Sequence, residues 1–292
     1  MSRKQICRKI KILKKCLVAG FIVLRLFSAA GNEAGTGLWA STYEYVQPFS
    51  LNPVNDGIQL GLGLTLSGSA LVCDKFLHIK DNTFNADDLN KSDIAGLEQI
   101  FMRPYSKPLH IVGTGTMVLA MATPAVFGTM PSNEWMTIGT MYLETLLIAN
   151  GIKEWTKLLV YRPRPYMYFD GYPQDKVDDG DWNCSFPSGH TTLAFAGAAF
   201  TTMVFCQCFP ESKWKYAVAG GAFGIAAATG ALRMASGNHF LTDVLVGAAI
   251  GTVCGFAVPY MHTQTFYGNF QKKAGGARAA VSPAGFAVSF DL

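Results

Sequence analysis

Charged side chains are scarce in this sequence. They make up 15% of the 292 residues, while half of the residues are apolar. An average soluble domain has roughly 25% charged residues. The net charge of +4 is small, and much of it lies at the N-terminus. These values exclude a basic surface for nucleic acid, so no nucleic-acid partner is expected.

Other signatures are missing as well. The 7 cysteines have neither the spacing of a metal site nor that of a disulfide framework. There is no internal repeat and no low-complexity linker. The polar segment 78–108 contains no EF-hand, since its DNTFNADDLNKS stretch lacks glycine at the sixth position. The apolar blocks that remain are rich in glycine and alanine, a composition that suits close helix packing in or near a membrane.

The N-terminus has the pattern of an export signal. Residues 1–15 carry seven Lys or Arg and no acid, and a short apolar run then leads to Ser28-Ala29-Ala30. This pattern predicts a secretory signal peptide over residues 1–30. The alternative is an uncleaved signal anchor, although Arg25 interrupts a run shorter than the ~20 residues of a membrane span. Either way, the expected location is the bacterial cell envelope, with the active site facing the periplasm.

The rest of the chain predicts an all-α fold, a bundle of about six helices that is membrane-embedded or membrane-associated. An extended arm over 31–56 leads into a helical domain over 57–265, and a tail over 266–292 has an alternating pattern typical of a short strand. The expected helices cover residues 57–77, 109–128, 134–159, 190–206, 214–232 and 243–260.

How many of these helices cross a membrane is left open by the sequence. Block 243–260 is apolar throughout, but 190–206 is short, and 134–159 carries charges such as Glu144 and Lys153 that are costly inside a span. If the signal is cleaved or spans, an active site outside the cytoplasm requires that at least one early block does not cross. The sequence leaves the oligomeric state open too.

Three polar segments at the edges of apolar blocks carry the chemistry. The first is KLLVYRPRP, with Lys157 and Arg164 on either side of a helix end. Lysine offers a point charge, and arginine offers a planar fork that binds two phosphate oxygens. Pro163 and Pro165 end the helix and stiffen the loop. Taken alone, such a basic helix end is also typical of a dipole partner or a membrane-surface anchor.

The second segment is CSFPSGHTT, directly before a predicted helix. Ser188 is placed to cap the helix, and Gly189 lets the backbone approach an anion closely. Free N–H groups at a helix start form an anion site, and His190 can exchange a proton near neutral pH. The alternative is a capped helix with an interfacial histidine.

The third segment is RMASGNHFLTD. His239 and Asp243 are four positions apart and share a helix face if the helix begins near His239. A carboxylate beside an imidazole orients the ring and leaves the other nitrogen free to attack phosphorus. Asp243 also heads an apolar block, where a buried acid needs a partner.

Together these segments resemble the type 2 phosphatidic acid phosphatase (PAP2) superfamily, whose motifs are K-x6-R-P, P-S-G-H and S-R-x5-H-x3-D. Lys157 with Arg164-Pro165 fits the first motif, whereas Arg162-Pro163 does not, because Trp155 stands where its lysine would be. Pro187 to His190 matches the second motif. The third matches except that Leu232 replaces the family's serine. The resemblance covers roughly residues 100–262.

The resemblance implies a role for each matching residue. His239 is the nucleophile that forms a phosphohistidine, Asp243 orients it, and His190 is the general acid. The phosphate ligands are Lys157, Arg164, Ser188, Gly189 and Arg233. No metal and no cofactor is expected. His78, His110 and His262 are interpreted as helix-end or interface residues, because none has an acidic or cysteine neighbour at ligand spacing.

Three functions remain in competition. The favoured one is a phosphatase for a lipid phosphate or lipid pyrophosphate, in contact with membrane lipids. The second is a broad-specificity periplasmic acid phosphatase for soluble phosphoesters; a related fold uses the same pocket to hold vanadate. The third is a non-catalytic membrane binding or packing protein with a degenerate site, which rests on Leu232 alone.

Overall fold

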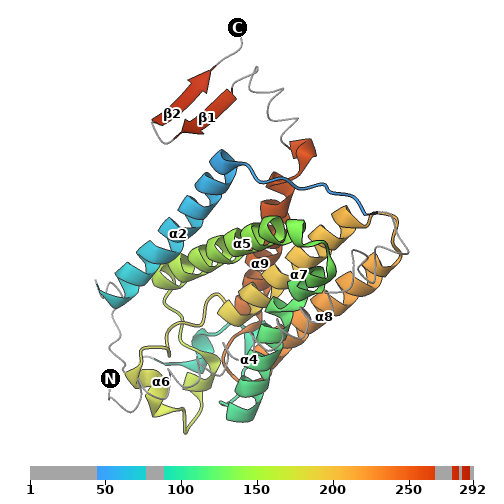
Figure 1. Cartoon of the computed structure of the whole chain (residues 1–292). Helices are drawn as coiled ribbons and strands as arrows, with labels where there is room; N and C mark the ends of the chain where they lie inside the picture. The colour runs from blue at the N-terminus through green and yellow to red at the C-terminus, as the bar shows by residue number, and fades with distance from the viewer. Residues whose placement is uncertain (1–44, 77–88, 267–277, 283–284, 290–292) are drawn as a thin grey trace, which may run out of the picture.

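The computed structural model describes residues 45–76, 89–266, 278–282 and 285–289. The predicted signal peptide and residues 31–44 of the predicted arm lie outside these described residues. In Figure 1 the long helices form one bundle, and the C-terminal hairpin lies beyond one end of it. The predicted all-α fold class is therefore confirmed.

Six long helices build the described part of the bundle, close to the predicted blocks. They are α2 (Pro53–Lys75), α4 (Lys107–Met121), α5 (Ser132–Leu159), α7 (Gly189–Cys208), α8 (Trp214–Ala235) and α9 (Leu241–Met261). Short helical turns connect them: η2 (Lys91–Asp93), α3 (Gly96–Gln99), η3 (Thr123–Thr129), η4 (Pro165–Tyr168) and α6 (Gln174–Asp178). The strand predicted in the tail is present as β1 (Arg278–Ser282), which pairs antiparallel with β2 (Gly285–Ser289).

Helix α2 begins four residues earlier than predicted, at Pro53. The side chain of Asn52 accepts hydrogen bonds from the backbone N–H groups of Val54 and Asn55. An N-cap asparagine followed by proline is a strong helix start. Residues 53–56 therefore belong to the helix, and Asp56 lies in its first turn.

Helix α7 is the centre of the bundle, with α4, α5, α8 and α9 packed around it. Its closest neighbour is α9, through a stripe of glycines at 247, 251 and 255. A Cβ atom added at Gly247 would lie 2.6 Å from the carbonyl oxygen of Ser188, and one at Gly255 would lie 2.6 Å from Cβ of Ala199. Small residues four apart let two helix backbones approach this closely. The stripe therefore fixes the start of α7 against the start of α9.

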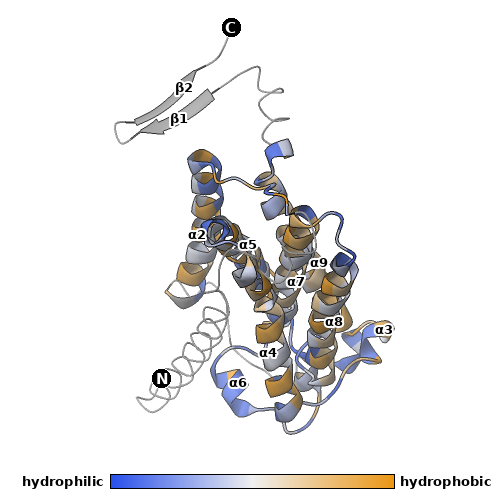
Figure 2. Ribbon diagram, turned by 45° about the vertical axis from the view of Figure 1, so that its right-hand side comes forward, coloured by the Kyte–Doolittle hydropathy of each residue, from blue (hydrophilic) through white to orange (hydrophobic). Residues whose placement is uncertain are grey.

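Within the part of the chain that the structure describes, four helical segments are long and apolar enough to cross a membrane: Lys107–Thr129, Gly189–Cys208, Trp214–Ala235 and Leu241–Met261. Large apolar side chains are exposed on the outer helices, for example Ile111 (59%) and Val253 (65%). Figure 2 shows apolar residues along the sides of the long helices and polar residues in α6 and the nearby loops. This arrangement is that of a membrane protein, because its apolar rim needs lipid.

Two expectations about spans can now be compared with the structure. The block expected to be short, 190–206, is extended to the 20 residues of α7, so its length is sufficient. Helix α5 carries charges, but Glu134, Glu144 and Lys153 are buried inside the bundle. Protein neighbours therefore surround these charges, as a membrane environment requires.

Candidate active site

The three motif segments meet at one end of the bundle, where α5 and α8 end and α7 and α9 begin. A cavity of about 1360 Å³ lies there, walled on one side by α2. Most of the predicted site residues line it: Lys157, Arg164, Gly189, His190, Arg233 and His239. Ser188 and Asp243 are fully buried and lie behind this lining.

His239 lies in the turn between α8 and α9. Gly237 makes this turn with φ +72°, and a Cβ atom there would lie 2.7 Å from the carbonyl oxygen of Pro104. The ring nitrogen Nδ1 of His239 is 2.7 Å from the carbonyl oxygen of Ser185, so Nδ1 carries the proton and donates it. Nε2 then holds a lone pair and accepts from Nη1 of Arg164 at 3.1 Å. Nε2, the nitrogen with the lone pair, is therefore part of a ring that lines the cavity.

Burial lowers the pKa of His239 to about 3, and the neighbouring Arg164 and Arg233 act in the same direction. Asp243 opposes the shift but does not overcome it. The imidazole is therefore neutral at pH 7, the form that a nucleophile needs.

Asp243 supports His239 less directly than the sequence predicted. Its Oδ2 is 3.7 Å from Nδ1 of His239, so the direct hydrogen bond of the ring goes to the backbone of Ser185. The same carboxylate accepts hydrogen bonds from the Ser185 hydroxyl and, at 2.8 Å, from the backbone N–H of Phe240. Asp243 thus holds both segments that flank the histidine.

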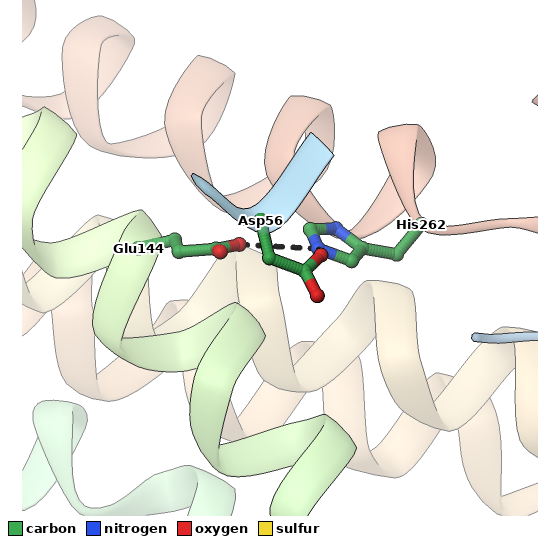
Figure 3. Close-up of side chains that lie close together, drawn as sticks. All are labelled: Asp56, Glu144 and His262. Atoms are coloured by element: carbon green, nitrogen blue, oxygen red, sulfur yellow. Dashed lines mark hydrogen bonds and ion pairs between the residues drawn. The ribbon is translucent and has the colours of Figure 1, made fainter. Parts of the chain in front are cut away.

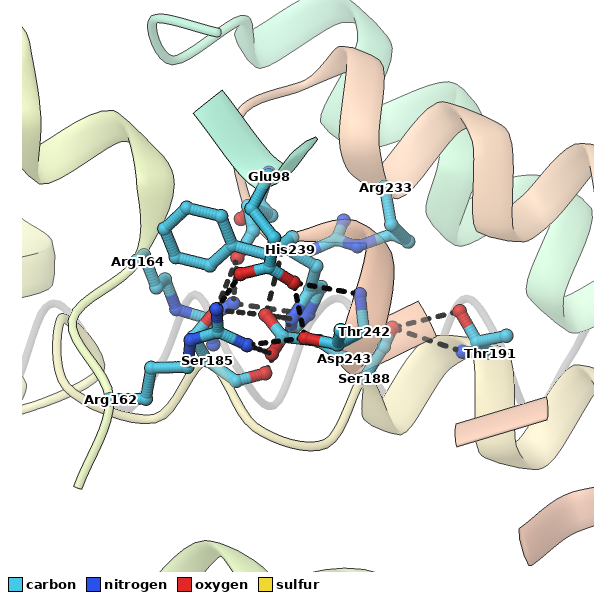
Figure 4. A network of polar contacts seen from close by, with 12 residues as sticks. Glu98, Arg162, Arg164, Ser185, Ser188, Thr191, Arg233, His239, Thr242 and Asp243 are labelled. Atoms are coloured by element: carbon cyan, nitrogen blue, oxygen red, sulfur yellow. Dashed lines mark hydrogen bonds and ion pairs between the residues drawn. The ribbon is translucent and has the colours of Figure 1, made fainter. Parts of the chain in front are cut away.

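A buried ion-pair network behind Asp243 was not predicted (Figure 4). Nη1 of Arg162 lies 2.5 Å from Oδ1 of Asp243, and its other nitrogen pairs with Glu98. Glu98 also accepts from the backbone N–H of Thr242 at 3.1 Å. Arg162 lies over the ring of Phe240, 4.2 Å from its centroid. Glu98 is far away along the chain in α3, so no motif spacing reveals it.

Arg164 reaches into the cavity from a fixed base. Its Nη2 pairs with Asp181 at 2.6 Å, and its Nε donates to the backbone carbonyl of Asp181 at 2.8 Å. Burial by itself raises the pKa of Asp181, but Arg164 and Lys176 outweigh burial and hold the pKa well below its usual range. Asp181 therefore remains a carboxylate that orients the guanidinium.

The other cations surround the start of α7 and the end of α8. A Cβ atom added at Gly189 would lie 3.5 Å from Nζ of Lys157, which places that ammonium beside the first turn of α7. Nη1 of Arg233 is 3.0 Å from Nδ1 of His110. Lys157, Arg164 and Arg233 thus approach one cavity from three different elements, an arrangement that favours a bound anion.

His190 and His110 lie side by side in the cavity wall, with ring centroids 6.1 Å apart. Nε2 of His190 is 3.1 Å from Oγ1 of Thr114, whose hydroxyl donates to the His110 carbonyl. Nε2 therefore donates to Thr114. His110 is the helix-end and interface residue that the sequence predicted, since it lies in the first turn of α4 where α4 packs on α7 and α8. Its place in the cavity wall was not predicted.

The two remaining motif positions are Ser188 and Leu232. Ser188 caps α7 as predicted, since its Oγ accepts from the backbone N–H of Thr191 at 3.4 Å. Its role in phosphate binding stays a prediction. Leu232, which replaces the family's serine, faces helix α4: a Cβ atom at Gly113 would lie 3.3 Å from Cβ of Leu232.

The PAP2 superfamily model matches residues 138–267, the part of the chain that carries all three motifs. Over these residues the chain is similar to the PAP2 superfamily. It is also similar to the lipid A 1-phosphatase of Porphyromonas gingivalis, with 42% identity over 77 residues. The match covers 26% of this chain and 16% of that relative.

Two solved structures are also similar to the chain. Aquifex aeolicus LpxE covers 58% of this chain and 98% of its own, with 20% identity and a TM-score of 0.39. The transmembrane PAP2-type phosphatidylglycerolphosphate phosphatase of Bacillus subtilis covers 75% of this chain and 96% of its own, with 20% identity and a TM-score of 0.41.

Proposed function

We propose that the protein is a membrane phosphatase that hydrolyses a lipid phosphate or lipid pyrophosphate, with His239 as the nucleophile. The observation that carries the proposal is the cavity itself. It combines a neutral, buried imidazole, a second histidine and three cations with a wall of apolar side chains. Phosphoryl transfer needs an in-line nucleophile, a proton donor and cations that stabilise the transition state.

The reaction has two steps. In the first, the lone pair on Nε2 of His239 attacks phosphorus while the phosphoester P–O bond breaks. His190, protonated on both ring nitrogens when the phosphate is bound, gives one proton to the leaving oxygen and becomes neutral, and the three cations hold the remaining phosphate oxygens. In the second, His190 takes a proton from water, the resulting hydroxide attacks phosphorus, and the P–N bond breaks. Inorganic phosphate leaves and both histidines return to their starting forms.

A lipid substrate is favoured by apolar side chains in the wall of the cavity. Leu64 and Leu71 from α2 and Leu158 from α5 line the same cavity as His239. An acyl chain can pack on these side chains while its phosphate lies among the cations. The lipid A 1-phosphatase similar to this chain supports a phosphorylated lipid of the bacterial envelope. The predicted export signal supports an active site that faces the periplasm.

Two alternatives predict other results. A broad-specificity phosphatase would not need the apolar wall and would hydrolyse a soluble aryl phosphate as well as a lipid. A non-catalytic protein would bind phosphate without turnover. Leu232 gives this alternative little support, since its side chain packs on α4.

The test is phosphate release by the purified protein in detergent, on a dispersed lipid phosphate and on a soluble aryl phosphate in parallel. We expect a strong preference for the lipid and a loss of at least ~10³-fold in His239→Ala. A short reaction with ³²P-labelled lipid should leave an acid-labile, alkali-stable label on the wild-type chain and none on His239→Ala. Size-exclusion and circular dichroism profiles verify that the variant is folded.

Each other outcome has a defined meaning. Equal rates on both substrates would favour the broad-specificity enzyme. Turnover that survives in His239→Ala would refute the proposed nucleophile. Binding of phosphate without turnover on either substrate would favour the non-catalytic protein.

A further inference from the structure

A second group of titratable side chains lies at the opposite end of α9 from the phosphatase cavity. Asp56 comes from the first turn of α2, Glu144 from α5, and His262 directly follows α9 (Figure 3). At about 1.5 Å per helical residue, His262 is roughly 28 Å from Asp243. The proposed phosphatase mechanism uses none of these three residues.

The three side chains converge on one point. Nε2 of His262 is 3.0 Å from Oδ1 of Asp56 and 3.1 Å from Oε2 of Glu144. The ligand atoms of all three residues lie within 4.8 Å of one another. Ligands about 2.0–2.2 Å from a metal ion and roughly 90–110° apart are separated by about 2.8–3.6 Å. Both distances from the imidazole nitrogen fall inside this range.

The orientation of His262 suits a metal ligand. Its Nδ1 is 2.9 Å from the carbonyl oxygen of Val258. A carbonyl only accepts, so Nδ1 carries a proton and, in the neutral ring, Nε2 presents its lone pair to the two carboxylates. Histidine ligands are commonly held in this way, with the other ring nitrogen donating to a carbonyl.

The charges of the cluster need a cation. The Glu144 side chain is fully buried, that of Asp56 is 13% exposed, and within the described residues no Lys or Arg forms an ion pair with either. Beyond the ion pair with His262, neither oxygen of Glu144 has a hydrogen-bond partner in that part of the chain. Even a protonated His262 leaves one negative charge uncompensated. Burying such a charge is costly, whereas a divalent ion with a neutral imidazole balances both carboxylates.

We propose that Asp56, Glu144 and His262 bind one divalent first-row transition-metal ion, of the class of Zn²⁺ or Mn²⁺. One imidazole nitrogen and two carboxylate oxygens suit such ions, and water completes the coordination. The ion ties the start of α2 to α5 and to the end of α9. Because α2 forms the apolar wall of the phosphatase cavity, the site stabilises that wall from the other end of the bundle.

The experiment measures metal binding by the full chain purified in detergent, stripped with EDTA and then dialysed against Zn²⁺. We expect one equivalent of zinc per chain by mass spectrometry and a rise in Tm that grows with zinc concentration. Asp56→Asn and Glu144→Gln should each weaken zinc binding at least ~10-fold, since each removes one charged ligand. His239→Gln is the matched control: it removes a histidine from the phosphatase cavity and should keep the full zinc content.

Three results would overturn the proposal. One is a wild-type chain that takes up no stoichiometric zinc and shows no change in Tm. Another is unchanged binding in both carboxylate variants. The third is loss of zinc in His239→Gln, which would place the metal in the phosphatase cavity. If Glu144→Gln does not fold, Asp56→Asn provides the same test, because that side chain is partly exposed.

Discussion

The two ends of the bundle hold histidines in the same way and surround them with opposite charge. His239 and His262 each donate from Nδ1 to a backbone carbonyl, at 2.7 and 2.9 Å. Nε2 of His239 then meets the guanidinium of Arg164 at 3.1 Å, whereas Nε2 of His262 meets two carboxylates. The group that faces Nε2 is thus a cation at one end, which suits an anion, and a pair of carboxylates at the other, which suits a cation.

The protonation of the two rings follows their neighbours. Burial lowers the pKa of His239 to about 3, with help from Arg164 and Arg233. Burial also acts to lower the pKa of His262, but its hydrogen bonds to Glu144 and to the Val258 carbonyl outweigh this effect, so the pKa is raised. The backbone hydrogen bond alone therefore does not decide the function of a buried imidazole; the charges facing Nε2 do.

The largest loss of activity is expected when a cation is removed from the phosphatase cavity. Arg164→Ala should lower kcat/KM by on the order of 100- to 1,000-fold, because a phosphate loses a buried, charged hydrogen-bond donor. Arg164→Lys should recover only part of this loss, since lysine keeps the charge without the planar fork. Phosphate release on the lipid substrate measures both.

The matched control for that prediction is Lys215→Ala. Lys215 is partly exposed near the start of α8, so this variant removes one positive charge at the opposite end of the helix from Arg233 and should leave kcat/KM unchanged. An Arg164→Ala enzyme that kept more than about a tenth of wild-type activity would contradict the assignment of this cavity as the phosphate site.

A smaller loss of activity is expected when Asp243, which holds the segments around His239, is substituted. Asp243→Asn should lower kcat by roughly 100-fold with little change in KM, because Asp243 positions the nucleophile and does not contact substrate. An amide cannot accept at both atoms from Arg162, Ser185 and Phe240 as the carboxylate does. Steady-state kinetics separate the two parameters. A rise in KM at unchanged kcat would instead indicate a substrate-binding role.

The close contact between α7 and α9 along the glycine stripe can be tested by measuring the stability of the protein. A Cβ atom at Gly251 would overlap the carbonyl oxygen of Thr192 and lie 2.8 Å from the backbone nitrogen of Ala196. Gly251→Ala should therefore destabilise the protein by about 1–3 kcal/mol, seen as a lower Tm in detergent. Gly220→Ala in α8 is the control, because no atom lies within 4 Å of that added Cβ. Equal Tm values for the two variants would refute close α7–α9 contact at this position.

The smallest effect concerns pH. A pKa of about 3 for His239 keeps its ring neutral as pH falls from 8 to 5, whereas an unperturbed histidine would gain a proton near pH 6.5. The carbon signal of the His239 ring in a ¹³C-histidine-labelled sample, assigned by its loss in His239→Gln, should not shift over this pH range. A titration with a midpoint near 6.5 would contradict the buried, cation-flanked environment of His239.

The candidate residues of the phosphatase cavity could be selected from the sequence because each motif is local. Lys157 and Arg164, the run Ser188 to His190, and Arg233 with His239 each form a short motif at a helix edge. The cavity brings together most of the residues that these motifs contain. Periodicity likewise predicted the six long helices, since the hydrophobic effect acts on their apolar blocks directly.

Other features could not be predicted from the sequence because their partners are distant along the chain. His110 lies beside Arg233 and His190 only because α4 packs against α7 and α8. His262 has no acidic residue at ligand spacing in the sequence. In the folded protein, however, Asp56 and Glu144 both contact its Nε2. Glu98 and Arg162 join Asp243 through the same kind of long-range contact.

The sequence by itself therefore determined the helical class, the helix boundaries to within a few residues, and three motifs that resemble those of the PAP2 superfamily. Local patterning fixes these features, because each depends on residues within one or two turns. Only the tertiary structure decided which charges face each buried histidine. Distant side chains come within hydrogen-bonding distance through the glycine stripe between α7 and α9 and through the packing of α2 on α5. Electrostatic interactions in a buried site depend on that distance.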